Sequence, residues 1–395
     1  MTKFLILEDS SKSGFGGGQR VTLNIINVIQ SSRLDSCNQI YIFDFYNPFH
    51  LETEFSKSAC QIPNVHYRRL FVNLFQIKPS SVRSSNSVYL FEAISYPLFF
   101  VVNSVVLLIS YSLLWARTRD RDKLAVYISA KSPLFLSIIL TIFRPRIYYH
   151  SHNVAKKGLM NNLLLLIMRI TGAQEISVSK ASSITNTSIV IPNPSSSSKV
   201  TLLHDTINLK FQDKCFATMS NLLKWKGIQN YLDAIPLIDK FHDSVAPRLS
   251  HRIYGKGNYL EVLQRHSIEL SLHSVSFRGF VSDVLSVLRD EVFCLVLPSI
   301  ACEACPMTLI EAVSLGVPVI TTNIGGQYEY LPDCLKSYCY PPGDKKALAM
   351  SISKLASLDE SSYLTLCENI LNQAFIFSYK SFSEKVSATL CIDEI

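Results

Sequence analysis

Short apolar segments alternate with longer amphipathic stretches along most of the chain. The apolar segments have the length and composition of strands that are buried on both faces, which is typical of parallel sheets. They lie at residues 3–9, 39–45, 64–72, 124–130, 146–151 and 175–179, and again at 214–220, 251–256, 275–280, 294–299 and 318–322. A Pro- and Ser-rich linker at 188–199 separates the two series. The pattern predicts an α/β protein with two Rossmann-like parallel-sheet domains, residues 1–195 and 196–375.

Parallel sheets bind ligands at predictable places. The loops beyond the carboxyl ends of the strands form the binding site, and two such sheets can face a central cleft. We therefore expect functional residues directly after the strands, in a cleft between the domains.

Two apolar stretches depart from this alternation. Residues 97–116 contain no charged side chain, and twenty residues are enough to span a bilayer. Polar residues interrupt the stretch and a strand follows closely, which favours a helix that packs in the core or lies on a membrane surface over a spanning helix. Residues 159–170 are too short to span and lie beside basic residues, as expected of an interfacial or buried helix.

Charge is unevenly distributed between the two halves. Residues 1–200 carry 21 Lys and Arg against 10 Asp and Glu, whereas the remainder carries 17 against 21. With 48% apolar residues, the composition indicates that the basic half contacts an anionic membrane surface, and nothing in it indicates nucleic acid. The first residues lack the pattern of a secretory signal, and the ten cysteines lack a disulfide-framework spacing, so we expect a reduced cytoplasmic environment.

A glycine-rich turn follows the first predicted strand. It contains Gly14, Gly16, Gly17 and Gly18 and leads into an amphipathic helix, whose free amides can bind an anion. A simple turn is an equally good interpretation. The spacing is not that of the dinucleotide-binding fingerprint.

His150 and His152 end another predicted strand. Two such histidines are more often core or capping residues than ligands, and no third metal ligand is evident. Their position at a carboxyl end nevertheless suits a neutral imidazole that hydrogen-bonds a sugar hydroxyl.

The segment "CEACPMTLIEAVSLGVPVITTNIGG" at 302–326 carries the strongest signal. It contains Glu303 before a predicted helix and Glu311 within it, with Pro306 in the first turn and Gly316 at the end. Lys226 stands at another loop-to-helix junction, where an ammonium can neutralise a diphosphate.

Cys302 and Cys305 form a C-x-x-C motif within this segment. A structural zinc site would need a second pair, and the spacing of Cys334 and Cys339 is a poor match. A redox pair before a helix is physically possible, since the helix dipole lowers thiol pKa values. Both remain minor alternatives.

Glu303 and Glu311, with seven residues between them, resemble the E-x7-E signature of the retaining glycosyltransferases of family 4, also called group 1. Other blocks resemble the family in the same order: "GGGQR", "HSHN", "SVSKAS", "IVIPNP", "NLLKWKGIQNYLDAI", "IYGKGNY", "VSFRGFVSD" and "YPPGD". The resemblance covers nearly the whole chain. It implies the two-domain GT-B fold and a metal-independent hexosyltransferase without a cofactor, whose donor is a UDP- or GDP-sugar. It also implies that a last helix, at about 360–390, returns to the first domain, so that 376–395 form a C-terminal tail.

Roles in the second domain follow from the resemblance, position by position. Lys226 would bind the donor diphosphate, and Glu311 would accept hydrogen bonds from the ribose hydroxyls. Glu303, as a catalytic residue, would hold the transferred sugar together with the amides of the following turn, at Met307 and Thr308.

In the first domain, the resemblance assigns Gly16 and Gly17 to the phosphates or the acceptor. It assigns His152, the other catalytic candidate, to the sugar near the reacting carbon.

One position departs from the family. An arginine usually lies five residues before the lysine and forms a second diphosphate clamp, but here the residue is Asn221. This substitution leaves open a catalytically inactive glycosyltransferase-like protein that serves as a binding or scaffold component. A nucleotide-sugar epimerase also stays open as an alternative, because the same two-domain frame could serve it.

The acceptor is inferred from bulk features alone. A basic and apolar first domain is consistent with a glycan or lipid-linked acceptor at the cytoplasmic face of a membrane, to which the protein binds peripherally. Lipopolysaccharide or another surface polysaccharide would be the product.

Overall fold

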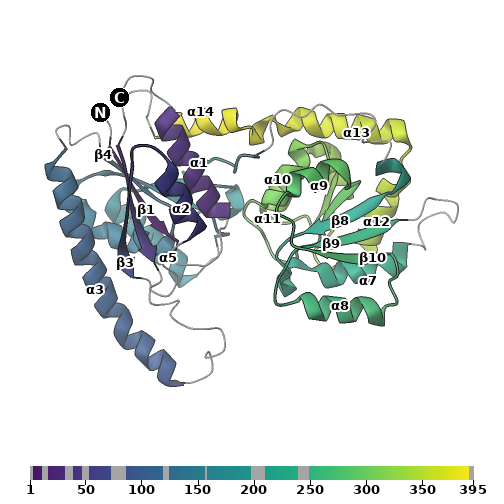
Figure 1. Cartoon of the computed structure of the whole chain (residues 1–395), viewed down its shortest axis with the longest axis horizontal. Coiled ribbons are helices and arrows are strands. Elements are labelled where there is room, and N and C mark those ends of the chain that lie inside the picture. The colour runs from purple at the N-terminus through teal and green to yellow at the C-terminus, as the bar shows by residue number, and fades with distance from the viewer. Residues whose placement is uncertain are drawn as a thin grey trace. The chain divides into compact units, whose positions relative to one another are not determined.

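The computed structural model describes residues 3–10, 17–31, 39–46, 53–72, 86–118, 124–155, 158–196, 210–238 and 249–390. These residues form two compact units (Figure 1). The N-terminal unit comprises the described residues of 1–178, 182–191 and 383–395, and the C-terminal unit comprises those of 179–181 and 192–382.

The N-terminal unit contains a seven-stranded sheet in which every neighbouring pair is parallel. Its strands are β1 (Lys3–Asp9), β2 (Gln39–Tyr46), β3 (Val65–Val72), β4 (Leu124–Ile128), β5 (Arg146–Ser151), β6 (Gln174–Ser177) and β7 (Ile189–Val190). In the order β3-β2-β1-β4-β5-β6-β7, successive strands are added on one side of β1 up to β3 and on its other side from β4 onward, so the strand order changes sides between β1 and β4. That reversal is the switch point at which open α/β sheets bind ligands.

Helices surround this sheet. They are α1 (Gly17–Ser31), α2 (Glu54–Gln61), α3 (Asn86–Ala116), α4 (Lys131–Leu136), η4 (Ser137–Phe143) and α5 (Leu159–Thr171), together with η5 (Lys180–Ser182) and α14 (Tyr379–Thr389), which the unit boundary divides. Side chains of α3, α4 and α5 pack on the sheet through Leu107, Leu134 and Leu164, all fully buried. The all-apolar strand β4 is buried along its whole length, as expected for a central parallel strand.

The C-terminal unit contains a five-stranded parallel sheet. Its strands are β8 (Cys215–Met219), β9 (Ser250–Tyr254), β10 (Val275–Gly279), β11 (Cys294–Leu297) and β12 (Val319–Thr321). The order β10-β9-β8-β11-β12 places the switch point between β8 and β11. These two all-parallel sheets confirm the predicted α/β class.

The helices of the C-terminal unit lie on both faces of its sheet, with α7 and α8 on one face and α9 and α10 on the other (Figure 1). They are η6 (Lys224–Lys226), α7 (Ile228–Ile238), α8 (Leu260–Glu269), α9 (Val284–Asp290), α10 (Met307–Ser314), α11 (Gly325–Glu329), η7 (Asp333–Tyr338), α12 (Lys345–Ala356), α13 (Glu360–Gln373) and η8 (Ala374–Phe377). Asp283, Asp344 and Asp359 cap α9, α12 and α13 by accepting a hydrogen bond from a first-turn amide.

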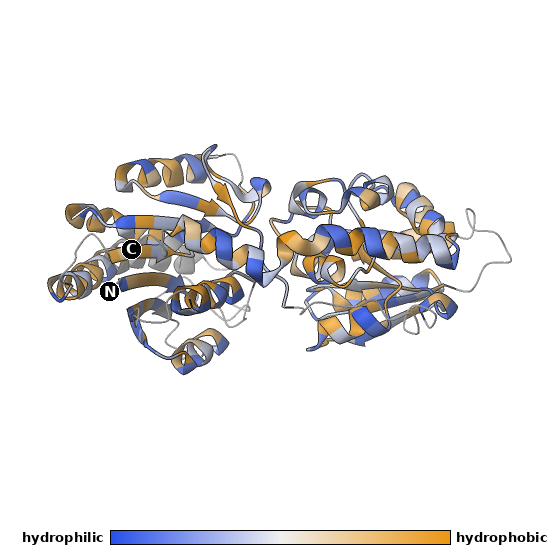
Figure 2. Ribbon diagram, turned by 90° about the horizontal axis from the view of Figure 1, so that it is seen from above, coloured by the Kyte–Doolittle hydropathy of each residue, from blue (hydrophilic) through white to orange (hydrophobic). Residues whose placement is uncertain are grey.

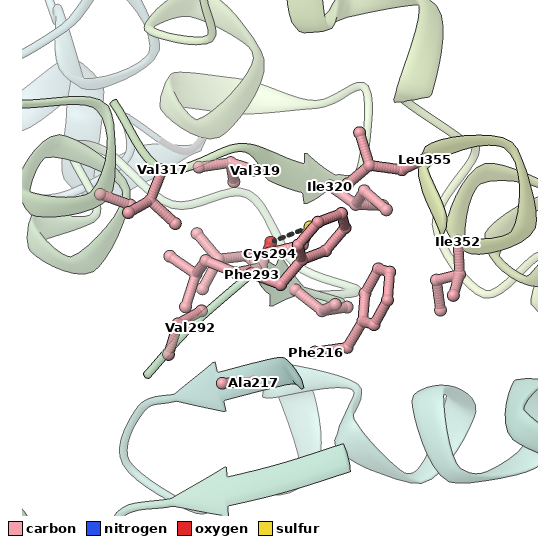
Figure 3. Packing of buried hydrophobic residues seen from close by; sticks show 14 of the residues in the cluster. Phe216, Ala217, Val292, Phe293, Cys294, Val317, Val319, Ile320, Ile352 and Leu355 are labelled. Atoms are coloured by element: carbon pink, nitrogen blue, oxygen red, sulfur yellow. Dashed lines mark hydrogen bonds between the residues drawn. The ribbon is translucent and has the colours of Figure 1, made fainter. Parts of the chain in front are cut away.

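Aromatic rings form the centre of the core in the C-terminal unit. Phe293 stacks on Tyr363 of α13 with ring centroids 4.2 Å apart, and it lies 5.7 Å from Phe216 of β8. Figure 3 shows Ile352 of α12 pointing toward the Phe216 ring, and Leu355 of the same helix beside Ile320. The Tyr363 hydroxyl donates to the Phe293 carbonyl at 2.7 Å, which satisfies the one polar group that this stacking buries. The stack therefore ties α13 to the sheet of the C-terminal unit.

Some sequence predictions differ from the structure in their boundaries. The linker predicted at 188–199 begins with the short strand β7, which pairs with β6. The helix predicted at about 360–390 is broken into α13 and α14, because residues 374–378 form a 3-10 turn and an extended residue between them. Residues 97–116 fall within α3, and no helix among the described residues is long and apolar enough to cross a membrane.

Candidate functional site

Lys226 and Glu303 meet at the switch point of the C-terminal sheet. Lys226 ends η6, which follows β8, and Glu303 lies in the loop between β11 and α10. The Lys226 Nζ and Glu303 Oε2 atoms are 2.6 Å apart, and the two side chains are 15% and 11% exposed. The ammonium also lies 4.5 Å from the centroid of the Trp225 ring. The sequence predicted both residues as functional, but not that they pair.

Gly227 fixes the position of the lysine. Its φ of +70° is left-handed, and a Cβ atom here would lie only 1.9 Å from the Pro298 carbonyl oxygen. The Ile300 amide donates to the Trp225 carbonyl at 3.0 Å. The loops that follow β8 and β11 are therefore packed directly on each other, and this packing brings the lysine to the glutamate.

Buried polar groups hold Glu303. Ser299 donates a short hydrogen bond to Glu303 Oε1, and the Gln327 side-chain oxygen accepts from the Glu303 amide at 2.8 Å. Gln327 is fully buried, and its amide nitrogen donates to the Ala301 carbonyl and to Thr322 Oγ1. Gln327 was not predicted from the sequence to be functional. The one feature that could have indicated it is its position, as a polar residue directly after the glycine pair.

The glycine pair that follows the E-x7-E pattern, Gly325 and Gly326, packs against the loop that contains Glu303. The Gly326 amide donates to the Glu303 carbonyl at 2.7 Å, and a Cβ atom at Gly326 would lie 1.8 Å from the Ala304 carbonyl oxygen. A Cβ at Gly325 would lie 2.1 Å from Cys302 Sγ, and its φ is +61°. Only glycine lets α11 approach the Glu303 loop this closely.

Helix α10 begins directly after this loop. Pro306 is its N-cap residue, so the amides of Met307 and Thr308 belong to the first turn, where a helix carries positive partial charge. Glu311, one turn further on, is only 5% exposed. The helix ends as predicted, because Gly316 follows its C-cap with a φ of +71°.

A cavity of about 170 Å³ opens at the carboxyl ends of β8, β9 and β10. Asn221 and Thr308, two of the predicted binding residues, both line it. The lining residues are Met219, Ser220, Asn221, Tyr254, Gly255, Lys256, Phe280, Val281, Val284 and Thr308. Pockets that enclose a whole drug-sized ligand measure about 300–1,000 Å³, so this cavity fits one part of a larger ligand.

A histidine pair ends β5 in the N-terminal unit. The Tyr127 hydroxyl and His150 Nδ1 are 2.6 Å apart, and the rings of His150 and His152 are 4.2 Å apart. Burial lowers the pKa of both imidazoles, that of His152 to about 4, so both are neutral at pH 7. Neither ring nitrogen of His152 has a hydrogen-bond partner within the described residues.

The amino end of α1 lies beside this pair. A Cβ atom at Gly18 would lie 3.4 Å from the His152 ring. Gly17, a predicted binding residue, is the first residue of α1, whereas Gly16 lies outside the described residues.

Two buried carboxyl groups lie at the ends of β1 and β2 in the same unit. Glu8 accepts a hydrogen bond from Ser129 Oγ at 2.6 Å, and Asp44 accepts short hydrogen bonds from Ser10 and Tyr67. Burial raises the pKa of Glu8 to about 7 and that of Asp44 to about 6. Neither residue was predicted from the sequence to be functional.

The cysteine pair of the 302–326 segment does not have the character of a redox pair. Burial raises the pKa of both thiols, that of Cys305 to about 12. Across the parts of the chain that the structure describes, no three His, Cys, Asp or Glu side chains group as metal ligands would.

Comparison with known proteins identifies the segment that carries this site. The sequence profile described as glycosyl transferases group 1 matches residues 202–373. Residues 202–373 belong to that family. The match includes Asn221, Lys226, Glu303 and Glu311.

Two curated relatives share part of the chain. An uncharacterized glycosyltransferase of Methanocaldococcus jannaschii is 25% identical over 154 residues, which is 38% of this chain and 38% of the relative. One subunit of the human phosphatidylinositol N-acetylglucosaminyltransferase is 31% identical over 174 residues, which is 43% of this chain and 32% of the relative. The alignments thus span about a third of the length of each relative.

A solved structure matches over the whole length. The Anabaena protein HepE, in complex with UDP-glucose, has a TM-score of 0.70 at 18% identity, with 99% of this chain and 100% of that chain covered. At this identity the likeness establishes the fold, two parallel-sheet α/β domains of the GT-B type.

Proposed function

We propose that the protein is a retaining glycosyltransferase that moves a sugar from a nucleoside diphosphate sugar to an acceptor. The observation that carries this proposal is the ion pair at the switch point between Lys226, which ends η6, and Glu303, in the loop that leads into α10. A cation and a helix amino end are what a departing pyrophosphate needs, and a carboxylate is what sugar hydroxyls need.

The ion pair would exchange partners when the donor binds. The ammonium of Lys226 would turn from Glu303 to a phosphate oxygen, and the freed Glu303 carboxylate would accept hydrogen bonds from the sugar. Because Gln327 and Ser299 hold the Glu303 loop from behind, the carboxylate stays in place during this exchange. Negative charge that develops on the leaving diphosphate is then stabilised by Lys226 and by the amides of Met307 and Thr308.

The nucleoside would occupy the adjacent part of the C-terminal unit. Glu311 would accept hydrogen bonds from the ribose hydroxyls, and the base would enter the cavity walled by Phe280 and Val281. HepE was solved with UDP-glucose, which makes this donor the first to test.

The N-terminal unit would supply the rest of the reaction centre. His152, neutral and with both ring nitrogens free of described partners, would bind the sugar near its reacting carbon. Gly16 and Gly17 would let the start of α1 approach a phosphate or the acceptor. The acceptor would attack on the face that the diphosphate leaves, with a phosphate oxygen taking its proton, so that configuration is retained without a metal ion.

Incubation with radiolabelled nucleotide sugars tests this function. The purified protein is mixed with UDP- and GDP-sugars and with lipid-linked glycan acceptors, and the products are separated. We expect transfer of the label to an acceptor. Donor binding without transfer would instead support a scaffold role, and conversion of the donor sugar to its isomer would support an epimerase.

The surface of the N-terminal unit supports a lipid-linked acceptor. The 3-10 helix η4 contacts both α3 and α5, and the three elements expose large apolar side chains. Figure 2 shows hydrophobic residues, in orange, along the surface helices of this unit. The exposed residues are Val101, Val102, Val105, Ile109, Leu113, Ile142, Leu159, Met160, Leu163, Leu166 and Ile170. Exposed Arg144, Arg146 and Arg169 lie on or next to the same elements. An anionic bilayer at the cytoplasmic face would therefore bury the apolar side chains and attract the arginines by their opposite charge.

Vesicle binding tests the membrane contact. We expect the protein to sediment with phosphatidylglycerol vesicles at low salt, and we expect Leu166→Glu to weaken that binding about tenfold, because burying a charge in the acyl region is unfavourable. Ile376→Glu, at an exposed apolar residue of the C-terminal unit, is the control and should bind as the wild type does. Equal loss in both variants, or no binding of the wild type, would exclude this surface as the contact.

A further inference from the structure

The donor pyrophosphate needs more positive charge than Lys226 supplies. A pyrophosphate that bridges a nucleoside and a sugar carries a negative charge on each phosphate, whereas Lys226 supplies a single positive charge. Asn221, which lines the cavity at the end of β8, contributes no charge. A second cation at this place would complete the site.

The loop that contains Lys256 is packed directly on the loop that contains Asn221. The Leu222 amide donates to the Lys256 carbonyl at 2.9 Å, and the Ser220 amide donates to the Tyr254 carbonyl at 3.2 Å. Glycines permit this approach, since a Cβ atom at Gly255 would lie 1.9 Å from the Ser220 carbonyl oxygen. Residues 221 and 256 are thereby neighbours across two loops.

Lys256 faces the same cavity as Asn221 and Thr308. Its ammonium lies 4.7 Å from the centroid of the Phe280 ring, which is 65% exposed. Among the residues that the structure describes, Lys256 forms no ion pair with a carboxylate. Lys256 is therefore a cation that lines the cavity, and within the described part of the chain its ammonium contacts a ring face and no carboxylate. Such a contact is weaker at an exposed site than a charge-assisted hydrogen bond to phosphate.

We infer that Lys256 is the second cation for the donor pyrophosphate and supplies the charge that Asn221 lacks. The inference rests on the proposed function. On donor binding, the flexible side chain of Lys256 leaves the Phe280 ring and contacts a phosphate oxygen. Lys226 and Lys256 then act as point charges on the diphosphate.

Calorimetric binding to four proteins tests this role: the wild type, Lys256→Gln, Asn221→Arg and the double variant. The probes are UDP, GDP and the two nucleosides. Of UDP and GDP, the one that binds the wild type more tightly is used for the comparison. We expect Lys256→Gln to bind it about tenfold more weakly, because this loss corresponds to the lower end of the free energy of one hydrogen bond to a charged group. We expect the affinity for the nucleoside to stay unchanged. Asn221→Arg should restore diphosphate binding in the Lys256→Gln background, because it returns a cation to the neighbouring loop.

A matched control separates this effect from a general change in charge. Lys354 of α12 also lies over an aromatic ring, 4.6 Å from the Tyr338 centroid, so Lys354→Gln removes a similar lysine elsewhere on the unit. Lys354→Gln should bind the diphosphate and its nucleoside as the wild type does. Unchanged diphosphate affinity in Lys256→Gln, or an equal loss for the nucleoside, would overturn the inference and leave the proposed function intact. Failure of the wild type to bind either diphosphate would overturn the proposed function, and the inference with it.

Discussion

Replacement of Lys226 by methionine is expected to lower kcat/KM for sugar transfer about 10²- to 10³-fold, which is the usual effect of removing one preorganised group that stabilises developing negative charge. Methionine keeps the length and most of the apolar stem of lysine but has no charge. The ammonium of Lys226 is held 2.6 Å from Glu303 by two loops packed on each other, so its position is preorganised before the donor arrives. The measurement is steady-state transfer at varied donor concentration.

The neighbouring lysine provides the control for this variant. Lys224 belongs to the same 3-10 turn but is exposed, and no carboxylate within the described residues pairs with it. Lys224→Met should retain transfer within about twofold, since exposed charges are screened by solvent. A loss of transfer in Lys226→Met smaller than about tenfold would show that Lys226 does not stabilise the leaving group.

Replacement of Glu8 by glutamine is expected to raise the free energy of unfolding at pH 8 by about 3 kcal/mol. Burial raises the pKa of Glu8 from 4.5 to about 7, so the folded protein binds a proton that the unfolded chain releases. Stability from this group is fully present below pH 4.5 and is lost as the pH rises through 7. Glutamine fits the same space without a charge, so the gain should appear at pH 8 and vanish near pH 4.

Unfolding of the N-terminal unit can be followed by its own tryptophan. The chain has two tryptophans, of which Trp115 belongs to the N-terminal unit and Trp225 to the C-terminal unit, so a Trp225→Phe background isolates the first. Glu175→Gln is the control, because this equally buried carboxylate accepts hydrogen bonds from two backbone amides and a hydroxyl. It should destabilise the unit at pH 8. A Glu8→Gln variant that is also destabilised at pH 8 would contradict the account of Glu8.

Strand positions were predictable because parallel strands are buried on both faces. Segments such as 124–130 and 294–299 therefore appear in the sequence as continuous apolar runs, and the structure places β4 and β11 inside them. Helix boundaries were less predictable. The break between α13 and α14 depends on packing, since the Ser195 amide donates to the Phe377 carbonyl at 2.8 Å, a contact between residues far apart in the sequence.

The individual site residues were predictable only where a loop follows a strand. Lys226 and Glu303 met that condition, but their pairing depends on the order of β8 and β11 in the sheet, which no local pattern reports. Lys256 gave no signal of its own, because an exposed lysine in a glycine-rich loop is common. Its relation to Asn221 becomes visible only when the loops after β8 and β9 are placed side by side.

The central claim is that the C-terminal unit binds a nucleoside diphosphate through Lys226 and the amino end of α10. Thermal unfolding in the presence of nucleoside mono- and diphosphates tests it most directly, because a ligand that binds the folded state raises the Tm. We predict that one nucleoside diphosphate raises the Tm of the wild type more than its monophosphate does, and that Lys226→Met loses that difference. No selective increase with any diphosphate, or the same increase in Lys226→Met, would contradict the claim.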